Sequence, residues 1–370
     1  MKKTISILGS TGSIGLSTFK IIDKKNFFKV ILLSANKNFG LICKQIKKYK
    51  PNYYLISDKK TFERVKKKFK KEKTVILNDI NQLNINKKID FTVSAIPGIA
   101  GLTPTLTLIK KSRKVLIANK ESIICGWELI KNKAKKFNSQ IIPVDSEHFS
   151  IFKLLENHSL HEIKKIYITA SGGPFLNYKV NQLKKIKPEN AINHPRWKMG
   201  KKISVDSSTM MNKILELIEA QKLFNISNNQ LDILIHPESL VHAIVELKNG
   251  LKKFIYHETS MIVPIANALF DKNLNIEDFY KNKKGNKIKN LTFKKVSSKI
   301  FPVIKLKNRV TEYPSTPIII NAANEILVHQ FLQKKIPFLS IIKIILSILS
   351  NRNYNKNAII KPANIKQINL

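Results

Sequence analysis

The first 145 residues alternate short runs rich in Val, Ile and Leu with longer stretches of helical periodicity, and this alternation restricts the fold more than any other feature. Continuous apolar runs are typical of parallel strands buried on both faces, with helices as the crossover connections. The pattern predicts an α/β fold with a doubly wound sheet. The predicted strands are Thr4–Leu8, Lys29–Ser34, Tyr53–Ser57, Thr74–Leu77, Phe91–Ile96, Lys114–Asn119 and Gln140–Val144.

The pattern changes after this region, and we expect three domains in all. In residues 146–270, strands at Lys165–Ala170 and Leu231–His236 mix with a helix at Ser208–Leu223, which indicates an α+β domain. Residues 271–297 are rich in Lys and Asn without clear periodicity and are predicted to be a linker. In residues 298–370, apolar side chains recur every three or four positions from Thr316, which predicts a small C-terminal helical domain.

The chain is strongly basic, with 66 Lys and Arg against 25 Asp and Glu, a net charge of +41. Hydrophobic residues still make up 43% of it, which excludes a disordered polycation. Nearly all of the positive charge is Lys, and no cluster of Arg suited to reading base edges occurs. We therefore expect no specific nucleic-acid partner and interpret most of the charge as solvated surface.

Cysteine usage and hydropathy bear on the compartment. Two cysteines, Cys43 and Cys125, cannot build a disulfide framework, which favours a reducing cytosol. The amino-terminal apolar run ends in a Gly/Ser turn, so we do not expect it to be a signal peptide. The longest apolar run, Pro337–Leu349, is too short to span a membrane and contains Lys343. We predict a cytoplasmic protein with no membrane partner.

A glycine-rich turn follows the first predicted strand. Gly9, Gly12 and Gly15 form a GxxGxxG variant of the Rossmann fingerprint, in which backbone N–H groups approach a pyrophosphate at a helix N-terminus. A tight turn without a ligand is the alternative. The second strand ends without the carboxylate that an NAD site expects, and Lys37 follows it, which favours a 2′-phosphate and hence NADP.

Two carboxylates stand out in so basic a chain. Asp145 and Glu147 directly follow a predicted strand, and residues two apart on an extended chain point the same way. Paired carboxylates suit Mg²⁺ or Mn²⁺. The same pair is equally consistent with the capped start of a helix at Glu147–Leu155. Glu216, on the helix at Ser208–Leu223, is a candidate third ligand.

Several polar groups near that helix suit a phosphate. Asn212 and Lys213, with Ser207 and Ser208 before them, offer a charge and hydrogen-bond donors, although a solvated Glu–Lys helix face is the alternative. Ser171 opens a Gly-Gly-Pro turn that suits an anion nest or an ordinary turn. The segment His194–Gly200 is interpreted as a mobile lid or a surface loop.

These motifs together resemble the 1-deoxy-D-xylulose 5-phosphate reductoisomerase family of the non-mevalonate isoprenoid pathway. The matching strings keep the family's order over most of the chain. They are GSTGSIG (Gly9–Gly15), ANKES (Ala118–Ser122), VDSEH (Val144–His148), TASGGPF (Thr169–Phe175), the segment His194–Lys213 with Glu216, the segment Ile235–His242, and NAANE (Asn321–Glu325).

The resemblance implies a homodimer with an NADPH-binding domain, a catalytic domain and a C-terminal helical domain. It implies cofactor contacts from Thr11, Gly12, Ser13, Ile14, Asn36, Lys37, Asn38, Asn119, Glu121 and Gly200. It implies a divalent metal on Asp145, Glu147 and Glu216. The implied substrate-binding residues are Lys120, Ser146, Glu147, Ser171, His194, Ser207, Asn212, Lys213 and Glu216, with Lys120, Glu147 and Glu216 catalytic. Trp197 and Met199 are implied on a closing loop.

The implied reaction rearranges 1-deoxy-D-xylulose 5-phosphate and reduces it with NADPH to 2-C-methyl-D-erythritol 4-phosphate. The sequence departs from the family's pattern at three places: Asn36 replaces a frequent Gly, Glu238 replaces a common Gln, and His257–Leu269 lacks an Asp-Met-Arg-Thr-Pro-Ile string. Two other hypotheses stay open. A semialdehyde dehydrogenase would need a nucleophilic cysteine, and a nucleic-acid-binding protein would use the charge.

Overall fold

The computed structural model describes residues 2–197, 199–270, 274–279 and 290–368. By its internal contacts the chain forms two compact units. The first consists of Met1–Asp145 and Ser260–Asn286, and the second of Ser146–Thr259 and Lys287–Leu370. In this division the segment that starts at Ser260 belongs to the first unit.

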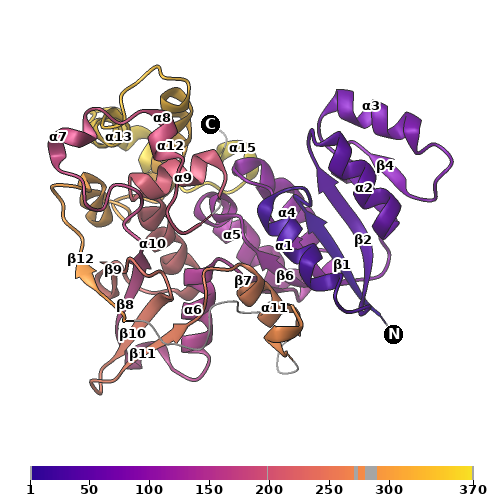
Figure 1. Ribbon diagram of the computed structural model, residues 1–370, viewed down its shortest axis with the longest axis horizontal. Helices are drawn as coiled ribbons and strands as arrows, with labels where there is room; N and C mark the ends of the chain where they lie inside the picture. Colours follow the sequence, from indigo (N-terminus) through magenta and orange to yellow (C-terminus); the bar gives the residue numbers. More distant parts are fainter. Residues whose placement is uncertain (1, 198, 271–273, 280–289, 369–370) are drawn as a thin grey trace. The chain divides into compact units, whose positions relative to one another are not determined.

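The first unit contains a seven-stranded parallel sheet in the order β4-β3-β2-β1-β5-β6-β7, with helices between successive strands (Figure 1). The order reverses direction between β1 and β5, as in a doubly wound sheet. Its strands are β1 Lys3–Leu8, β2 Phe28–Ala35, β3 Tyr53–Ile56, β4 Val75–Leu77, β5 Ile89–Ser94, β6 Ser112–Ile117 and β7 Gln140–Pro143. Its α-helices are α1 Ser13–Ile22, α2 Phe39–Tyr49, α3 Lys59–Lys68, α4 Leu102–Ile109, α5 Lys120–Phe137 and α11 Ile262–Phe270.

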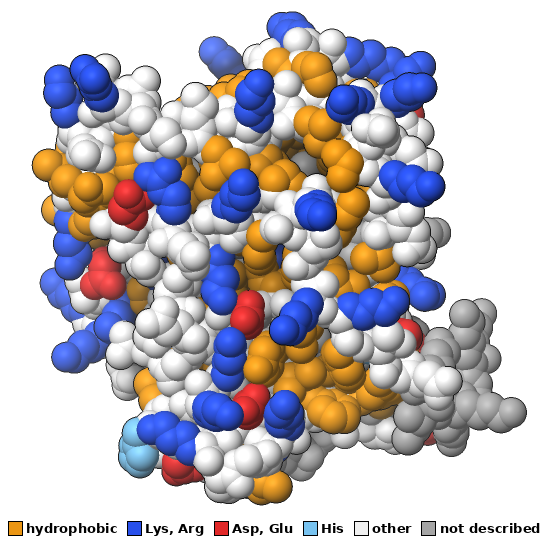
Figure 2. All heavy atoms as spheres, turned by 90° about the vertical axis from the view of Figure 1, so that its left-hand side faces the viewer, with side chains coloured by type: hydrophobic (Ala, Val, Ile, Leu, Met, Phe, Trp, Pro, Cys, Tyr) orange, Lys and Arg blue, Asp and Glu red, His pale blue; other side chains and the backbone are white. Residues whose placement is uncertain are grey.

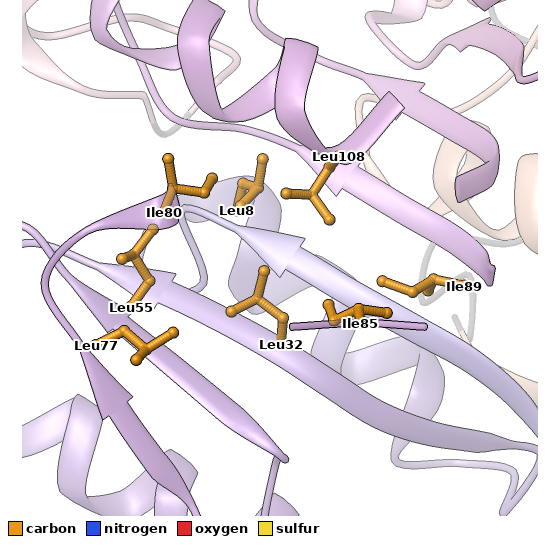
Figure 3. Packing of buried hydrophobic residues seen from close by; sticks show 8 residues of the cluster. All are labelled: Leu8, Leu32, Leu55, Leu77, Ile80, Ile85, Ile89 and Leu108. Carbon is orange, nitrogen blue, oxygen red and sulfur yellow. The ribbon is translucent and has the colours of Figure 1, made fainter. Parts of the chain in front are cut away.

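One core of this unit lies between the sheet and α4. Leu8, Leu32, Leu55 and Leu77 come from four neighbouring strands, and Leu108 of α4 packs with them (Figure 3). All are less than 9% exposed. The central strands are therefore buried because their Val, Ile and Leu runs face helices, which confirms the predicted α/β fold.

The second unit combines a mixed five-stranded sheet, in the order β11-β10-β8-β9-β12, with helices. The strands are β8 Ile163–Ala170, β9 Leu231–Ile235, β10 Val241–Leu247, β11 Lys252–Tyr256 and β12 Lys294–Lys295. The helices are α6 Ser146–Leu155, α7 Val180–Leu183, α8 Pro188–Ala191, α9 Lys201–Ser208, α10 Met211–Phe224, α12 Thr316–Leu332, α13 Ser340–Leu349, α14 Tyr354–Ala358 and α15 Ile365–Ile368. The carboxyl-terminal helices confirm the predicted helical region.

The helix predicted at Ser208–Leu223 is present as α10, but it begins only at Met211, because α9 and α10 meet at a corner before it. Helix α9 ends at Ser208, and α10 begins at Met211. Met210 between them has a φ of 63°, in the left-handed region that residues other than glycine rarely adopt. Because this backbone conformation interrupts the helix, the polar residues of α9 and α10 lie on two separate helices and not on one continuous helix.

The predicted linker at 271–297 is described only in part. Residues 274–279 contain a short 3₁₀ helix at Ile276–Asp278, and β12 pairs antiparallel with β9. Lys25 forms an ion pair with Asp278. Residues 271–273 and 280–289 lie outside the described residues.

On one face of the molecule, positive charge is spread rather than concentrated (Figure 2). On the face drawn in Figure 2, Lys and Arg side chains are scattered among apolar and uncharged surface, with a few acidic groups between them. Among the residues that the structure describes, no helix is long and apolar enough to cross a membrane.

Candidate functional site

Three carboxylates converge where β7 gives way to α6. Asp145 directly precedes α6, Glu147 lies in its first turn, and Glu216 lies on α10. Each offers one oxygen, and these oxygens lie within 4.8 Å of one another. The chain places the first two together because only Ser146 separates them. The start of a helix and a convergent carboxylate pair, the two interpretations that the sequence left open, therefore coexist.

Lys213 is the cation that faces these carboxylates. Its Nζ lies 2.6 Å from Glu147 Oε1 and 2.6 Å from Glu216 Oε2. Although burial lowers the pKa of Lys213, the two carboxylates raise it above its ordinary value, so the side chain is an ammonium. Lys213 is 8% exposed and Glu216 is 1% exposed. The alternative of a solvated Glu–Lys helix face is therefore wrong.

The donor set fits a hard divalent cation. Carboxylate oxygens are the ligands that Mg²⁺ and Mn²⁺ prefer. Asp145, Glu147 and Glu216 bring three negative charges into a small volume that is largely removed from water, an arrangement that is costly without cations. Asp145 also faces the ammonium of Lys120, with 3.6 Å between Oδ2 and Nζ.

A second group of polar side chains surrounds the turn after β8. Ser171 Oγ lies 3.1 Å from His194 Nε2, and the N–H of Gly173 donates to the same oxygen at 3.1 Å. Gly173 has a φ of 63°, and a Cβ there would lie 2.9 Å from the carbonyl oxygen of Ser207. The glycine therefore lets this turn pack against the end of α9, which brings Ser171 and Ser207 into one neighbourhood.

His194 organises the loop that precedes α9. Its Nδ1 accepts hydrogen bonds from the N–H groups of Arg196 and Trp197, at 3.1 and 2.9 Å. Because Nδ1 is an acceptor, Nε2 carries the proton and donates to Ser171 Oγ. Burial, with Lys213 and Arg196 nearby, lowers the pKa of His194 to about 4, so the ring is neutral near pH 7.

Trp197 rests on a pair of stacked histidines. Its ring centroid is 6.2 Å from that of His242, edge to face. His242 stacks on His257 with 4.0 Å between centroids. Burial, followed by the proximity of His257, lowers the pKa of His242 to about 3. Of the remaining loop residues, Met199 is half-buried, Gly200 precedes α9, and position 198 lies outside the described residues.

The remaining candidates of the second unit lie around the carboxylates. Ser146 donates from Oγ to Glu147 Oε2 at 2.7 Å. Asn212 donates from its amide to Glu216 Oε1. The structure therefore brings together the metal candidates and part of the phosphate candidates on α6 and α10.

In the first unit, the glycine-rich turn leads from β1 into α1. Gly9 has a φ of 82°, and a Cβ there would lie 2.5 Å from the carbonyl oxygen of Ala95. A Cβ on Gly15 would lie 2.6 Å from the oxygen of Gly9. Gly12 precedes the first residue of α1, Ser13, so Thr11, Gly12, Ser13 and Ile14 surround a helix N-terminus.

The ends of β2 and β6 carry the other cofactor candidates. Asn36, Lys37 and Asn38 follow β2 and are exposed, and Asn38 Oδ1 caps α2 by accepting from the N–H of Leu41. Asn119 follows β6 and caps α5, whose first turn contains Glu121. Both groups lie at carboxyl ends of strands, where open α/β sheets bind ligands.

Sequence reasoning missed several buried groups near the carboxylates. His148 Nε2 lies 2.9 Å from the backbone oxygen of Glu216, and its Nδ1 is 3.7 Å from Glu219 Oε2. His257 belongs to the stretch that departs from the family pattern. The available signal for His148 and Glu219 was a polar residue within an apolar run. That signal indicates a buried polar group, but it does not say which distant residue is its partner.

Family profiles match most of the chain. The profile described as 1-deoxy-D-xylulose 5-phosphate reductoisomerase matches residues 5–126, its C-terminal domain profile matches residues 141–224, and a second C-terminal profile of DXP reductoisomerase matches residues 257–369. A reductoisomerase of this name from Pelagibacter ubique is 46% identical over 99% of this chain and 96% of its own. One from a Wolbachia of Drosophila simulans is 44% identical over 94% and 90%.

Solved structures agree with these matches. A DOX-P reductoisomerase in complex with NADPH, fosmidomycin and magnesium is 31% identical, with a TM-score of 0.91 over 99% of this chain and 94% of that one. The Zymomonas mobilis enzyme in complex with NADPH is 31% identical, with a TM-score of 0.85 over 100% and 95%. The chain therefore belongs to the 1-deoxy-D-xylulose 5-phosphate reductoisomerase family.

Proposed function

We propose that the chain rearranges 1-deoxy-D-xylulose 5-phosphate and reduces it with NADPH to 2-C-methyl-D-erythritol 4-phosphate, in the presence of Mg²⁺ or Mn²⁺. The observation that carries this proposal is the convergence of three carboxylate oxygens within 4.8 Å beside Lys213, in a member of this family. The relatives in complex with NADPH and magnesium support the choice of cofactors. We further propose that the protein acts in the cytoplasm as a homodimer.

Asp145, Glu147 and Glu216 would hold the divalent cation through their carboxylates. When bound, the cation supplies Lewis-acid polarisation of the substrate's ketone group. Glu216 is the most buried of the three, so its charge acts in the least water-like surroundings. Glu147 and Glu216 fix the position of Lys213, whose ammonium lies between them.

The phosphate end of the substrate would be held by Ser146, Ser171, Ser207, Asn212 and Lys213. His194 donates from Nε2 and thereby orients the hydroxyl of Ser171. The His194–Gly200 loop, which contains Trp197 and Met199, would close over the substrate and exclude water. Remote contacts to a phosphate can supply binding energy for this closure.

Lys120 would assist proton movement at the reacting end. Its side chain is buried, and Nζ lies 3.6 Å from Asp145 Oδ2. An ammonium in this position can donate a proton to, or stabilise, a developing oxyanion. This assignment makes Lys120 a catalytic residue together with Glu147 and Glu216.

NADPH, when bound, supplies the hydride. Thr11 through Ile14 would meet its pyrophosphate, and Lys37 with Asn36 and Asn38 its 2′-phosphate. Asn119, Glu121 and Gly200 complete the proposed cofactor set. We assign residues 1–145 to NADPH binding, 146–270 to catalysis, 271–297 to a linker and 298–370 to the helical domain.

The decisive assay follows NADPH oxidation with purified protein and 1-deoxy-D-xylulose 5-phosphate. We expect turnover with Mg²⁺ or Mn²⁺ and none after chelation, with 2-C-methyl-D-erythritol 4-phosphate identified by mass spectrometry. Absence of turnover with either metal at neutral pH would overturn the proposal.

Burial of the cysteines argues against the dehydrogenase alternative. Cys43 and Cys125 are each 8% exposed, and burial raises the pKa of the Cys43 thiol. A reactive nucleophile needs an accessible, low-pKa thiolate. A thiol-blocking reagent should therefore leave the reductase activity unchanged. The nucleic-acid alternative predicts tight, steeply salt-dependent binding to RNA or DNA, which we expect to be absent at physiological salt.

A further inference from the structure

A buried polar network lies beneath the glycine-rich turn of the first unit. Ser10 of the turn, Gln45 of α2 and Tyr54 of β3 are 0%, 4% and 0% exposed. They come from three elements of one sheet-and-helix layer. Burial of three polar side chains in one place is costly unless each finds partners, and here each does.

Both polar atoms of the Gln45 side-chain amide form hydrogen bonds with Ser10. Its Nε2 donates to the backbone oxygen of Ser10 at 3.0 Å, and its Oε1 accepts from Ser10 Oγ at 2.7 Å. Tyr54 donates to the same Oε1 at 2.6 Å and lies 3.1 Å from Ser10 Oγ. Because burial raises the pKa of Tyr54, its hydroxyl keeps its proton and stays a donor.

The same turn is fixed from β2. The N–H of Gly9 donates to Ser34 Oγ at 3.0 Å, and the N–H of Ser10 donates to the carbonyl oxygen of Ser34 at 2.8 Å. The side chain of Ser10 is therefore directed into the protein, away from a ligand. Contacts from β2, β3 and α2 leave the following residues, Thr11–Ile14, to meet a phosphate at the start of α1.

We propose that Gln45 and Tyr54 are positioning residues for the dinucleotide, which hold the Ser10 backbone so that the turn is preformed for the pyrophosphate of NADPH. The inference rests on the proposed function, because it assumes that this turn binds NADPH. Neither side chain touches the cofactor. Their contribution is to remove alternative conformations of the turn before binding, so their loss weakens affinity without altering the chemical step.

A role in the pyrophosphate turn has a specific signature. NADPH and NADH share the pyrophosphate and differ at the 2′-phosphate, which is assigned to Lys37. Loss of Gln45 or Tyr54 should therefore weaken binding of both dinucleotides by the same factor. Loss of Lys37 should weaken binding of NADPH alone.

The test measures dissociation constants of NADPH and NADH for the metal-free, substrate-free protein, from the fluorescence of the nicotinamide. The variants are Tyr54→Phe, Gln45→Leu and Lys37→Ala. Tyr53→Phe is the matched control, because Tyr53 is the neighbouring residue of β3 and donates an equally short hydrogen bond, 2.6 Å, to the oxygen of Asn84. Thermal unfolding and circular dichroism report whether each variant is folded.

We expect a loss of affinity of roughly 5-fold for Tyr54→Phe and roughly 10-fold or more for Gln45→Leu, since a buried hydrogen bond contributes on this order. We expect wild-type affinity for Tyr53→Phe, and an unchanged KM for 1-deoxy-D-xylulose 5-phosphate at saturating NADPH in all three of these variants. If Gln45→Leu does not fold, Tyr54→Phe alone decides.

Wild-type affinity for both dinucleotides in Tyr54→Phe and Gln45→Leu would overturn the inference. So would a loss confined to NADPH, because that would place the effect at the 2′-phosphate. A folded wild-type protein that binds neither dinucleotide would instead overturn the proposed function.

Discussion

Removal of the Glu216 carboxylate should separate metal-dependent turnover from NADPH binding. It is 1% exposed and accepts from Lys213 at 2.6 Å. We predict that Glu216→Gln reduces metal-dependent turnover by at least about 100-fold, because a neutral amide is a poor ligand for a hard cation. NADPH affinity should stay unchanged, since the dinucleotide candidates that follow β1 and β2 belong to the first unit.

Turnover and nicotinamide fluorescence on the same preparation measure both quantities. Exposed Glu325 provides the control Glu325→Gln, which should match the wild type. Near-normal turnover of Glu216→Gln with Mg²⁺ would contradict the metal assignment.

Lys213 joins the carboxylates to the phosphate candidates. We predict that Lys213→Ala raises KM for 1-deoxy-D-xylulose 5-phosphate by roughly 10-fold or more, because a charge-assisted contact to phosphate contributes on the order of 1.5–3 kcal/mol. Steady-state kinetics at saturating NADPH measure it. Lys153→Ala, at an exposed pair with Glu156, is the control and should leave KM unchanged. An unchanged KM in Lys213→Ala would limit its role to the carboxylates.

His242 makes the stability of the protein depend on pH. Burial, followed by the proximity of His257, lowers its pKa to about 3 in the folded protein, against an ordinary value of 6.5. As the pH falls below 6.5, His242 takes up a proton in the unfolded chain but stays neutral in the folded protein. The free energy of unfolding should therefore decrease between pH 6.5 and pH 3, by at most about 1.4 kcal/mol per pH unit for this group.

Urea titration of the metal-free protein at pH 7 and pH 5 measures this loss. In His242→Asn the difference between the two pH values should shrink by about 2 kcal/mol. His161→Asn, at an exposed histidine, should retain the wild-type difference. Equal differences in all three proteins would contradict the assignment to His242.

At the scale of elements, some features of the fold could be predicted from the local sequence pattern, and others depend on tertiary packing. The strands β1 to β7 were predictable because each is an apolar run with helices on either side, and only their ends shift by one or two residues. The corner at Met210 was not, since a methionine with a positive φ has no local signature.

The candidate site divides in the same way. Asp145 and Glu147 are two residues apart, and Glu216 lies four residues from Asn212, so local spacing indicated these neighbours. The stacking of His242 on His257 and the contact of His148 with Glu219 join different elements. Only the folded chain brings such pairs together, and one sequence contains no record of which distant residues meet.

Helices α9 and α12 are joined by a buried polar contact. Asp206 is fully buried, and its Oδ1 accepts from Asn324 Nδ2 at 2.8 Å, while Lys202 Nζ lies 2.8 Å from Oδ2. We predict that Asn324→Leu destabilises the protein by about 2–4 kcal/mol, because it leaves a buried carboxylate oxygen without its amide partner.

Denaturant unfolding of the two proteins measures this difference. Glu325→Leu, the adjacent exposed position of α12, should change stability by less than about 0.5 kcal/mol. A change of that small size in Asn324→Leu would show that the contact contributes little to the packing of α9 on α12.

At the scale of the whole molecule, the net charge of +41 affects the stability of the fold whether or not a partner is bound. Like charges spread over a surface repel one another and favour expansion of the chain, and salt screens this repulsion. We predict that the melting temperature rises by about 2 °C or more between about 20 mM and about 300 mM NaCl.

Differential scanning fluorimetry in a chelating buffer measures this shift. Sorbitol at the same osmolality serves as the uncharged control and should give a smaller rise. A melting temperature that is constant or falls with salt would mean that local ion pairs outweigh the repulsion.

The position of Lys213 between Glu147 and Glu216 has a consequence for the order in which the site fills. The ammonium already serves as an internal counter-ion, so a divalent cation held by Asp145, Glu147 and Glu216 would compete with it for Glu147 and Glu216. This competition would weaken the apparent affinity for the metal. A metal on these carboxylates would leave the lysine available to a phosphate, so we expect metal and substrate to bind with positive cooperativity.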